Sequence, residues 1–273
     1  MAVINNRALA KTVEDLKILG TKRYMDIQRE ASSFYIGNYY SLESKGDIFY
    51  TSEYCYGLGF GLDGEVLAAD LEALERYIVS RNISSHLHLE ITPFCPQPFL
   101  ALLQEKGYTL DHFLAVWILE TDQWEPKIND GVNLDLSIVQ VDESSSFDWA
   151  WTVALGISAD HTVNEEAMES VRAFYEVPNN TAFLLKEGEE NVAGATIAIE
   201  GELAELFLTG TIKPFRERGH QNRLIEERIR FAKNQGCKYV TVTTKPGTSS
   251  SRNMEMNGFK LMYHRAVLKS PLI

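Results

Sequence analysis

The most informative segment of the chain is Leu208 to Arg230, LTGTIKPFRERGHQNRLIEERIR. Its first residues follow the pattern of a β-strand that ends at Ile212, and Pro214 cannot continue the strand because proline lacks an amide hydrogen. Apolar residues then recur at helical spacing, which predicts a helix over residues 219–235. We therefore expect a strand, a short turn with two arginines and a glycine, and a helix directly after it.

The predicted turn is suited to binding a diphosphate. The first amides of a helix have no acceptor within the helix and lie at the positive end of its dipole. Gly219 lets a phosphate approach the backbone closely, and Arg216 and Arg218 add positive charge in the same turn. The alternative interpretation, an ordinary exposed turn before a helix, is open when these residues are taken alone.

The elements around this turn complete a mixed layer of strands and helices. On the helix 219–235, Leu224, Ile225, Ile229 and Ala232 are predicted core residues, whereas Glu226, Glu227, Arg228 and Lys233 are predicted to form the solvated face. In the second half of the chain, strands are predicted over 134–141, 181–186, 192–199, 203–212 and 238–243, with two more ending near Leu268, and helices around 147–155, 164–175, 219–235 and 249–256. The order βααβββαβαββ indicates an α/β (α+β) fold.

The first half repeats part of this plan. Its predicted helices cover 7–19, 24–35, 66–80 and 96–106, and its strands cover 47–52, 54–60 and 86–91, with a final pair ending near Leu119. A strand, a helix, a Gly-aromatic pair and a further strand follow one another in residues 86–119 and again in residues 238–268. We infer a tandem repeat of one fold.

A polar segment without periodicity, TDQWEPKINDG at residues 121–131, separates the two halves. It contains a proline and a glycine, as domain linkers often do. The predicted domains are therefore residues 1–125 and residues 132–273.

The turn carries a family resemblance. Arg216-Glu217-Arg218-Gly219-His220-Gln221 resembles the coenzyme A signature of the GNAT N-acetyltransferases, Arg/Gln-x-x-Gly-x-Gly/Ala, although Gln221 stands where a small residue is usual. Downstream, Asn253 followed by Gly258-Phe259 looks like the closing segment of that family. The resemblance covers residues 133–273 well and residues 1–120 in outline. It implies two tandem GNAT-like domains, each a mixed, mostly antiparallel central sheet flanked by helices.

The resemblance also implies the ligand and the residues that bind it. The family uses acetyl-CoA as acyl donor, without a metal, and holds its pantetheine between two splayed central strands. The amides from Arg218 to Asn222 would hold the pyrophosphate, the backbone of Thr211 and Ile212 would pair with the pantetheine, and Asn253 would contact the far side. The implied cofactor-binding residues are Thr211, Ile212, Arg216, Arg218, Gly219, His220, Gln221, Asn222 and Asn253.

The implied reaction is direct attack of an amine on the thioester, with backbone donors stabilising the oxyanion. The tyrosine that often serves as acid in the family is replaced by Met254, which leaves Tyr263 as the candidate acid. Glu205, on the strand before the turn, is the candidate base, and a water relay is equally open. An ordinary solvent-facing strand residue is the alternative for Glu205. The acceptor is a small-molecule or peptide amine.

Two further interpretations stay open. Met254 in place of tyrosine also suits a non-catalytic coenzyme A-binding or sensing module. In the first half, Asp63 and Glu65 occupy the turn that corresponds to the arginine-bearing one, so this half is predicted to have lost cofactor binding. It would then complete the acceptor cleft or scaffold the fold, or serve as a protein-interaction domain that recruits a polypeptide acceptor.

Composition narrows the cellular context. The net charge of -12 argues against a nucleic-acid partner, since phosphate binding needs clustered Lys and Arg. Three cysteines without a C-x-x-C pair suggest reduced thiols, and the absence of a long apolar run predicts no membrane span. We expect a cytoplasmic protein, and a homodimer is one of the assemblies that the sequence leaves open.

Overall fold

The computed structural model describes residues 6–31, 38–43, 45–50, 54–83, 86–127 and 135–271. The chain forms two compact units. The first contains Met1–Val116 with Thr244–Thr248 and Leu261–Ile273, and the second contains Trp117–Thr243 with Ser249–Lys260. These units differ from the predicted halves, 1–125 and 132–273, because the C-terminal strand belongs to the first unit. Residues 128–134 of the predicted linker region lie outside the described residues.

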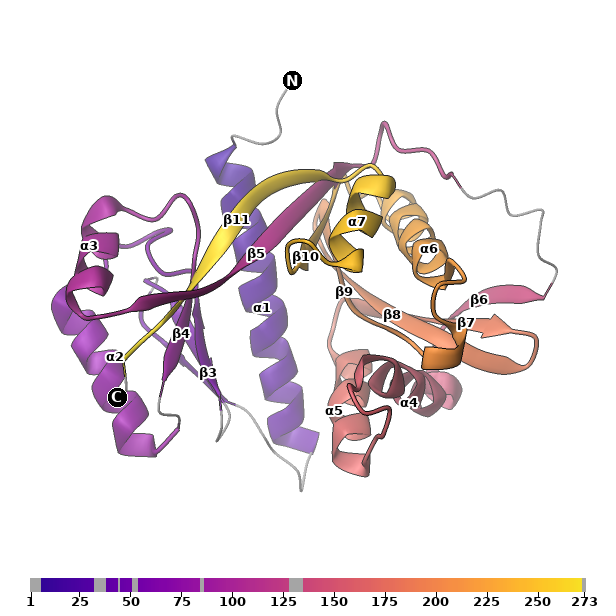
Figure 1. Ribbon diagram of the computed structural model, residues 1–273, viewed down its shortest axis with the longest axis horizontal. Coiled ribbons are helices and arrows are strands. Elements are labelled where there is room, and N and C mark those ends of the chain that lie inside the picture. Colours follow the sequence, from indigo (N-terminus) through magenta and orange to yellow (C-terminus); the bar gives the residue numbers. More distant parts are fainter. Residues whose placement is uncertain are drawn as a thin grey trace. The chain divides into compact units, whose positions relative to one another are not determined.

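The first unit is a sheet with helices on both faces (Figure 1). Its strand order is β1-β2-β3-β4-β11-β5. β3 and β4 are parallel, whereas β1–β2, β2–β3 and β4–β11 are antiparallel. The elements are α1 (Arg7–Ala31), β1 (Asn38–Ser41), β2 (Asp47–Tyr50), β3 (Cys55–Leu58), α2 (Ala68–Arg81), β4 (Leu87–Ile91), α3 (Gln97–Glu105), β5 (Thr109–Glu120) and β11 (Lys260–Lys269). β5 contributes its last four residues to the second unit.

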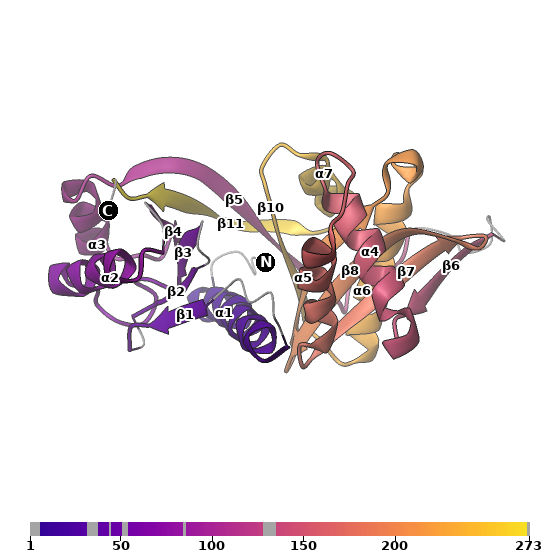
Figure 2. The same cartoon turned by 90° about the horizontal axis from the view of Figure 1, so that it is seen from below.

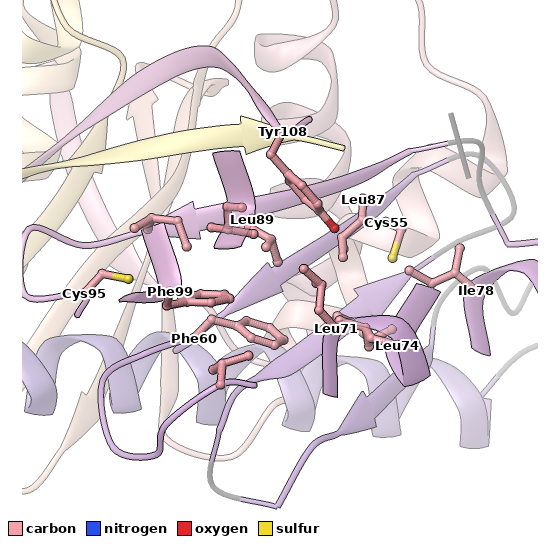
Figure 3. Packing of buried hydrophobic residues seen from close by; sticks show 14 of the residues in the cluster. Cys55, Phe60, Leu71, Leu74, Ile78, Leu87, Leu89, Cys95, Phe99 and Tyr108 are labelled. Carbon is pink, nitrogen blue, oxygen red and sulfur yellow. The ribbon is translucent and has the colours of Figure 1, made fainter. Parts of the chain in front are cut away.

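The first unit has two hydrophobic layers, and adjacent residues of β2 belong to different ones. Successive side chains of a strand point to opposite faces, so Ile48 and Phe49 enter different layers. Phe49 packs with Met25 of α1. Ile48 belongs to the larger layer under α2 and α3, in which Leu71, Leu74 and other residues interlock (Figure 3).

The second unit has the same layered plan. Its strand order is β5-β10-β9-β8-β7-β6, with β9 and β10 parallel and β6–β7, β7–β8 and β8–β9 antiparallel. Helices α4 and α5 lie on one face, and α6 lies on the other (Figures 1 and 2). The elements are β6 (Leu136–Gln140), η2 (Glu143–Ser145), α4 (Ser146–Ile157), α5 (Glu165–Glu176), β7 (Asn180–Glu187), β8 (Glu190–Glu200), β9 (Leu203–Thr211), η3 (Lys213–Phe215), α6 (His220–Asn234), β10 (Tyr239–Thr244) and α7 (Ser249–Met256). The predicted fold class is confirmed.

Three predicted element boundaries are wrong. The two N-terminal helices are one helix, α1, which continues through Gly20 because a single glycine costs a helix only about 1 kcal/mol. Its buried stripe, which includes Val13, Leu16 and Met25, continues past that glycine. The strand pairs predicted near Leu119 and Leu268 are single long strands, β5 and β11.

Within the described residues, no helix combines the length and the apolar character that crossing a bilayer requires.

Candidate functional site

The site forms where β9 separates from β10. Parallel pairing between these strands extends from Leu203 to Leu206 of β9. Directly after that point the antiparallel ladder with β8 contains a bulge, since Phe207 pairs with Thr196 whereas Gly210 pairs with Gly194. Two residues of β9 therefore stand opposite one residue of β8. Bulges of this kind bend a strand and are common next to active sites.

Leu208 marks the bulge in the backbone. Its φ of 46° lies in the left-handed region, which a branched apolar residue rarely adopts. Thr209, the second bulge residue, turns its hydroxyl back to the Phe207 carbonyl at 3.4 Å. The regular register of β9 with β8 is thus interrupted at a defined place and resumes at Gly210.

The last residue of β9 has backbone groups that point away from β8. The Ile212 amide donates to Val192 O, and antiparallel pairs alternate between bonded and non-bonded positions. The N–H and C=O of Thr211 therefore face the opposite edge, where Arg216 Nε donates to Thr211 O at 3.1 Å. Ile212 differs, because its amide is already bonded to Val192 and its carbonyl accepts from the Phe215 amide.

The N-terminus of α6 offers a run of free donors. Gly219 precedes the helix with a φ of 82°, and the first helical bond runs from the Arg223 amide to Gly219 O. In the described part of the chain, the six amides from Glu217 to Asn222 have no hydrogen-bond acceptor. The first turn of α6 carries no acidic residue that could cap them. Unpaired amides at a helix start are a ready anion site.

A cavity of about 600 Å³ adjoins these amides and the end of β9. It is wide enough for part of a nucleotide-sized ligand. Its lining residues are Gly156, Thr209, Thr211, Phe215, Arg216, Glu217, Gly219, His220, Gln221, Asn222, Ser249, Ser250, Arg252 and Asn253. Seven of the nine residues predicted to bind the cofactor therefore line one cavity, whereas Ile212 and Arg218 do not.

Arg216 is anchored by two carbonyl groups. Besides Thr211 O, it donates through Nη2 to Gly156 O at 2.8 Å, near the C-terminus of α4. A cation at that end satisfies a carbonyl that has no partner within the helix. Arg216 thus ties α4 to the end of β9 and presents positive charge at the cavity wall.

Arg218 is turned towards β7. Its Nη1 lies 3.2 Å from Glu187 Oε1, and its guanidinium covers the Phe215 ring at 4.9 Å from the ring centre. The other carboxylate oxygen of Glu187 lies 3.2 Å from Nε2 of His220, a buried imidazole. Burial lowers the pKa of His220, and the opposing effect of Glu187 does not cancel that shift. The lowered pKa favours the neutral imidazole.

An amide network joins α6 to α7. Asn253 Nδ2 donates to Gln221 Oε1 at 2.8 Å, and Asn257 Nδ2 donates to Asn222 Oδ1 at 3.0 Å. Asn257 also bonds to the Asn253 carbonyl, which links the two pairs. Gln221 thus fills its position with a bond to α7, where the family pattern has a small residue.

The two predicted catalytic residues are not in the cavity lining. Glu205 is half-buried in β9, opposite Thr241 of β10. Tyr263 is buried in the first unit, where its hydroxyl donates to Glu14 at 2.5 Å. Burial, reinforced by the Glu14 charge, raises the pKa of Tyr263, which makes it a weaker acid. Their catalytic roles stay predictions, and Met254 is buried in α7.

Sequence reasoning missed several lining residues. Arg252 is exposed at the cavity, and in the described chain it has no ion pair. Arg252 lies in the first turn of α7, after Ser249 and Ser250 and directly before Asn253. This position next to a predicted ligand residue was the signal in the sequence that could have identified it. Gly156 had no signal at all, because its role depends on contact with β9, 54 residues further on.

The prediction for the outer face of α6 is partly wrong. The core residues Leu224, Ile225, Ile229 and Ala232 are buried, as predicted. Glu226 and Arg228, predicted to face solvent, are also buried, at 4% and 2% exposure. Glu226 accepts the Lys127 amide at 3.0 Å, so both charged side chains have found internal partners.

The family comparison agrees with this geometry. Residues 146–259 match the model of the Acetyltransferase (GNAT) family. The matched segment contains the bulge, the turn and the amide network described above. Residues 146–259 of this chain are therefore similar to the acetyltransferase domain of the GNAT family.

Solved structures with a similar fold extend over most of the chain. A GCN5-related N-acetyltransferase from Kribbella flavida is similar with a TM-score of 0.60 at 15% identity, covering 85% of this chain and 88% of that one. One from Sphaerobacter thermophilus gives 0.61 at 12% identity, with 86% and 84% covered. A tandem GNAT protein from the clavulanic acid biosynthesis pathway gives 0.59 at 11% identity, with 82% and 78% covered. The chain thus has the fold of tandem GNAT proteins.

No curated protein sequence is similar to this chain.

Proposed function

We propose that this protein is an acetyl-CoA-dependent N-acetyltransferase whose second unit binds the acyl donor. One observation supports this above all others. Six amides, Glu217 to Asn222, have no acceptor among the described residues, and they lie at the start of a helix, at the wall of a cavity of about 600 Å³. A diphosphate is the group that such a row of donors suits best. The anchored guanidinium of Arg216 adds charge beside it.

The rest of the donor fits along the strand edge. The N–H and C=O of Thr211 point away from β8, and the carbonyl that accepts from Arg216 Nε has a second lone pair. An extended amide chain such as pantetheine can therefore pair there as an added strand. Leu208 and Thr209 at the bulge would then adjoin the thioester. When bound, acetyl-CoA supplies the activated acyl group, and the protein orients it for attack by an amine.

Calorimetry with acetyl-CoA tests the binding step. We expect one saturable site, and Gln221→Glu should weaken binding by about tenfold or more, because it places a carboxylate among the phosphate donors while keeping the acceptor for Asn253. Gln123→Glu, an exposed change in the same unit, is the matched control and should leave the affinity unchanged. Absence of binding at millimolar acetyl-CoA contradicts the proposal.

Turnover is tested separately by release of free thiol with a panel of amines. We expect amine-dependent release above the rate of buffer hydrolysis. Binding without any release would instead favour the second candidate, a coenzyme A-binding or sensing module. The observation behind that candidate is the absence of Glu205, Tyr263 and a tyrosine at position 254 from the cavity lining.

A further inference from the structure

Arg228 is a buried cation without a buried anion. It lies on α6 at 2% exposure, and in the described chain no carboxylate forms an ion pair with it. An isolated buried charge is costly unless its hydrogen-bonding groups are satisfied. This guanidinium must therefore be held by neutral acceptors, and their identity shows what the side chain does.

Its acceptors lie at the bulge of β9. Nη1 of Arg228 donates to Thr196 O at 2.9 Å and lies 3.4 Å from Phe207 O, while Nε donates to Leu224 O at 2.9 Å. Thr196 and Phe207 are the last regularly paired residues before the bulge. A bulge disrupts the ladder at that point, so nearby carbonyls need another donor, and Arg228 supplies it.

The same carbonyl connects Arg228 to the cavity. Phe207 O also accepts from the Thr209 hydroxyl at 3.4 Å, and Thr209 lines the cavity. Removal of the guanidinium leaves the two carbonyls of the bulge without this donor. Loss of the bulge would change the register of β9 by one residue and move Thr209 and Thr211 to other faces.

We propose that Arg228 is a positioning residue, which holds the β9 bulge open so that Thr209 and the edge of Thr211 face the acyl donor. This inference rests on the proposed function, because it concerns the acetyl-CoA site. Arg228 does not line the cavity. It acts through the two backbone carbonyls and, through them, on Thr209.

The test is a double-mutant cycle on acetyl-CoA affinity, measured by calorimetry. Arg228→Met has an apolar side chain of similar length, and we expect it to raise Kd at least tenfold while far-ultraviolet circular dichroism and cooperative unfolding are retained. Arg228→Lys keeps a donor and a charge within reach of the carbonyls, so it should bind more tightly than Arg228→Met. Arg230→Met, two residues further on and paired on the surface with Glu227, is the matched control and should leave Kd unchanged.

Thr209→Val completes the cycle. If Arg228 acts through the bulge, adding Thr209→Val to Arg228→Met should raise Kd no further, so the two effects are not additive. Additive effects, an Arg228→Met protein that binds as the wild type does, or an equal loss in Arg230→Met would each overturn the inference. If wild-type protein fails to bind acetyl-CoA, the proposed function is what fails, so the two failures are distinguishable.

Discussion

The turns that follow β3 and β9 have the same topology and opposite chemistry. Each leads from a strand with a parallel neighbour into a long helix, α2 or α6. The turn after β9 presents six amides without acceptors to a cavity of about 600 Å³. The turn after β3 presents the carboxylates of Asp63 and Glu65 to one of about 260 Å³. Of the two, only the turn after β9 suits an anion.

The difference lies in how each helix start is satisfied. Before α2, the Leu67 amide donates to the Asp70 carboxylate at 2.9 Å, so an internal anion already occupies that helix end. Lys11 pairs with Asp63 at 3.1 Å, so the positive charge next to this turn is already paired with a carboxylate of the chain. Before α6 there is no such internal carboxylate. Of the two helix starts, the one whose first amides are uncapped is therefore the one suited to an anionic ligand.

The greatest loss of stability should follow from disturbing the contact between Gly156 of α4 and the end of β9, which leads into the turn before α6. A Cβ at Gly156 would lie 2.5 Å from Thr211 N and 2.6 Å from Gly210 C, both backbone atoms that cannot yield without moving β9. We expect Gly156→Ala to lower the free energy of unfolding by about 2–3 kcal/mol. Urea denaturation measures this change.

Gly20→Ala is the matched control in the first unit. A Cβ at Gly20 meets nothing within 4 Å, and the residue lies inside α1, so the substitution should raise stability by up to about 1 kcal/mol. Equal effects of the two substitutions would show that α4 and β9 do not depend on close contact at Gly156.

A smaller effect, on the affinity for acetyl-CoA, is expected when a carboxylate is removed from the turn before α6. Glu217 lines the cavity and has a φ of 66°, a left-handed conformation that asparagine adopts more readily than glutamate. Glu217→Asn removes a carboxylate next to the expected phosphates, so binding of acetyl-CoA should tighten by about threefold at low salt. Glu125→Asn, exposed in the same unit, controls for net charge. Weaker binding in Glu217→Asn would mean that this carboxylate contributes to the site.

A third prediction concerns the pH dependence of stability. Burial lowers the pKa of His220 from 6.5, with Arg218 and Arg223 acting in the same direction and Glu187 against it. The unfolded chain takes up this proton as pH falls through about 6.5, before the folded chain does, so the free energy of unfolding decreases there. His220→Leu should lose less stability between pH 7 and pH 5 than the wild type. Urea denaturation at the two pH values measures the free energy of unfolding, and an equal loss in the two proteins would refute this.

The smallest effect is expected in the first turn. Asp63→Asn combined with Glu65→Gln removes the carboxylates but leaves the Leu67 amide bonded to Asp70. Calorimetry should still give one acetyl-CoA per chain, with unchanged affinity. A second binding event would show that repulsion alone, and not the capped helix start, keeps this turn empty.

The local pattern was readable from the sequence. A strand, Pro214, an arginine-bearing turn and an amphipathic helix depend on neighbouring residues, so their order and the core of α6 followed from spacing. The bulge at Leu208 was not readable, because it depends on pairing with β8. The same holds for Glu187, whose pairing with Arg218 joins residues 31 apart in the chain.

Arg228 shows most clearly what could not be predicted from the sequence. Arginine usually lies at the surface, and its helical position next to Glu227 indicated a solvated face. Its burial is explained only by two backbone carbonyls at a break in the ladder. Polarity alone cannot reveal an interior acceptor of this kind, since the acceptor belongs to the backbone and has no signature in side-chain chemistry.

The C-terminal strand β11 belongs largely to the first unit, and this has a practical consequence for producing either unit alone. Its Arg265 is buried and pairs with Glu14 of α1 at 2.8 Å, so the last strand is joined to the first helix. A fragment that begins after the polar segment 121–131 would contain β11 without its partner strand β4 and Arg265 without Glu14. An unpaired strand edge and an unpaired charge favour aggregation. A fragment meant to contain the second unit alone should therefore end before Leu261.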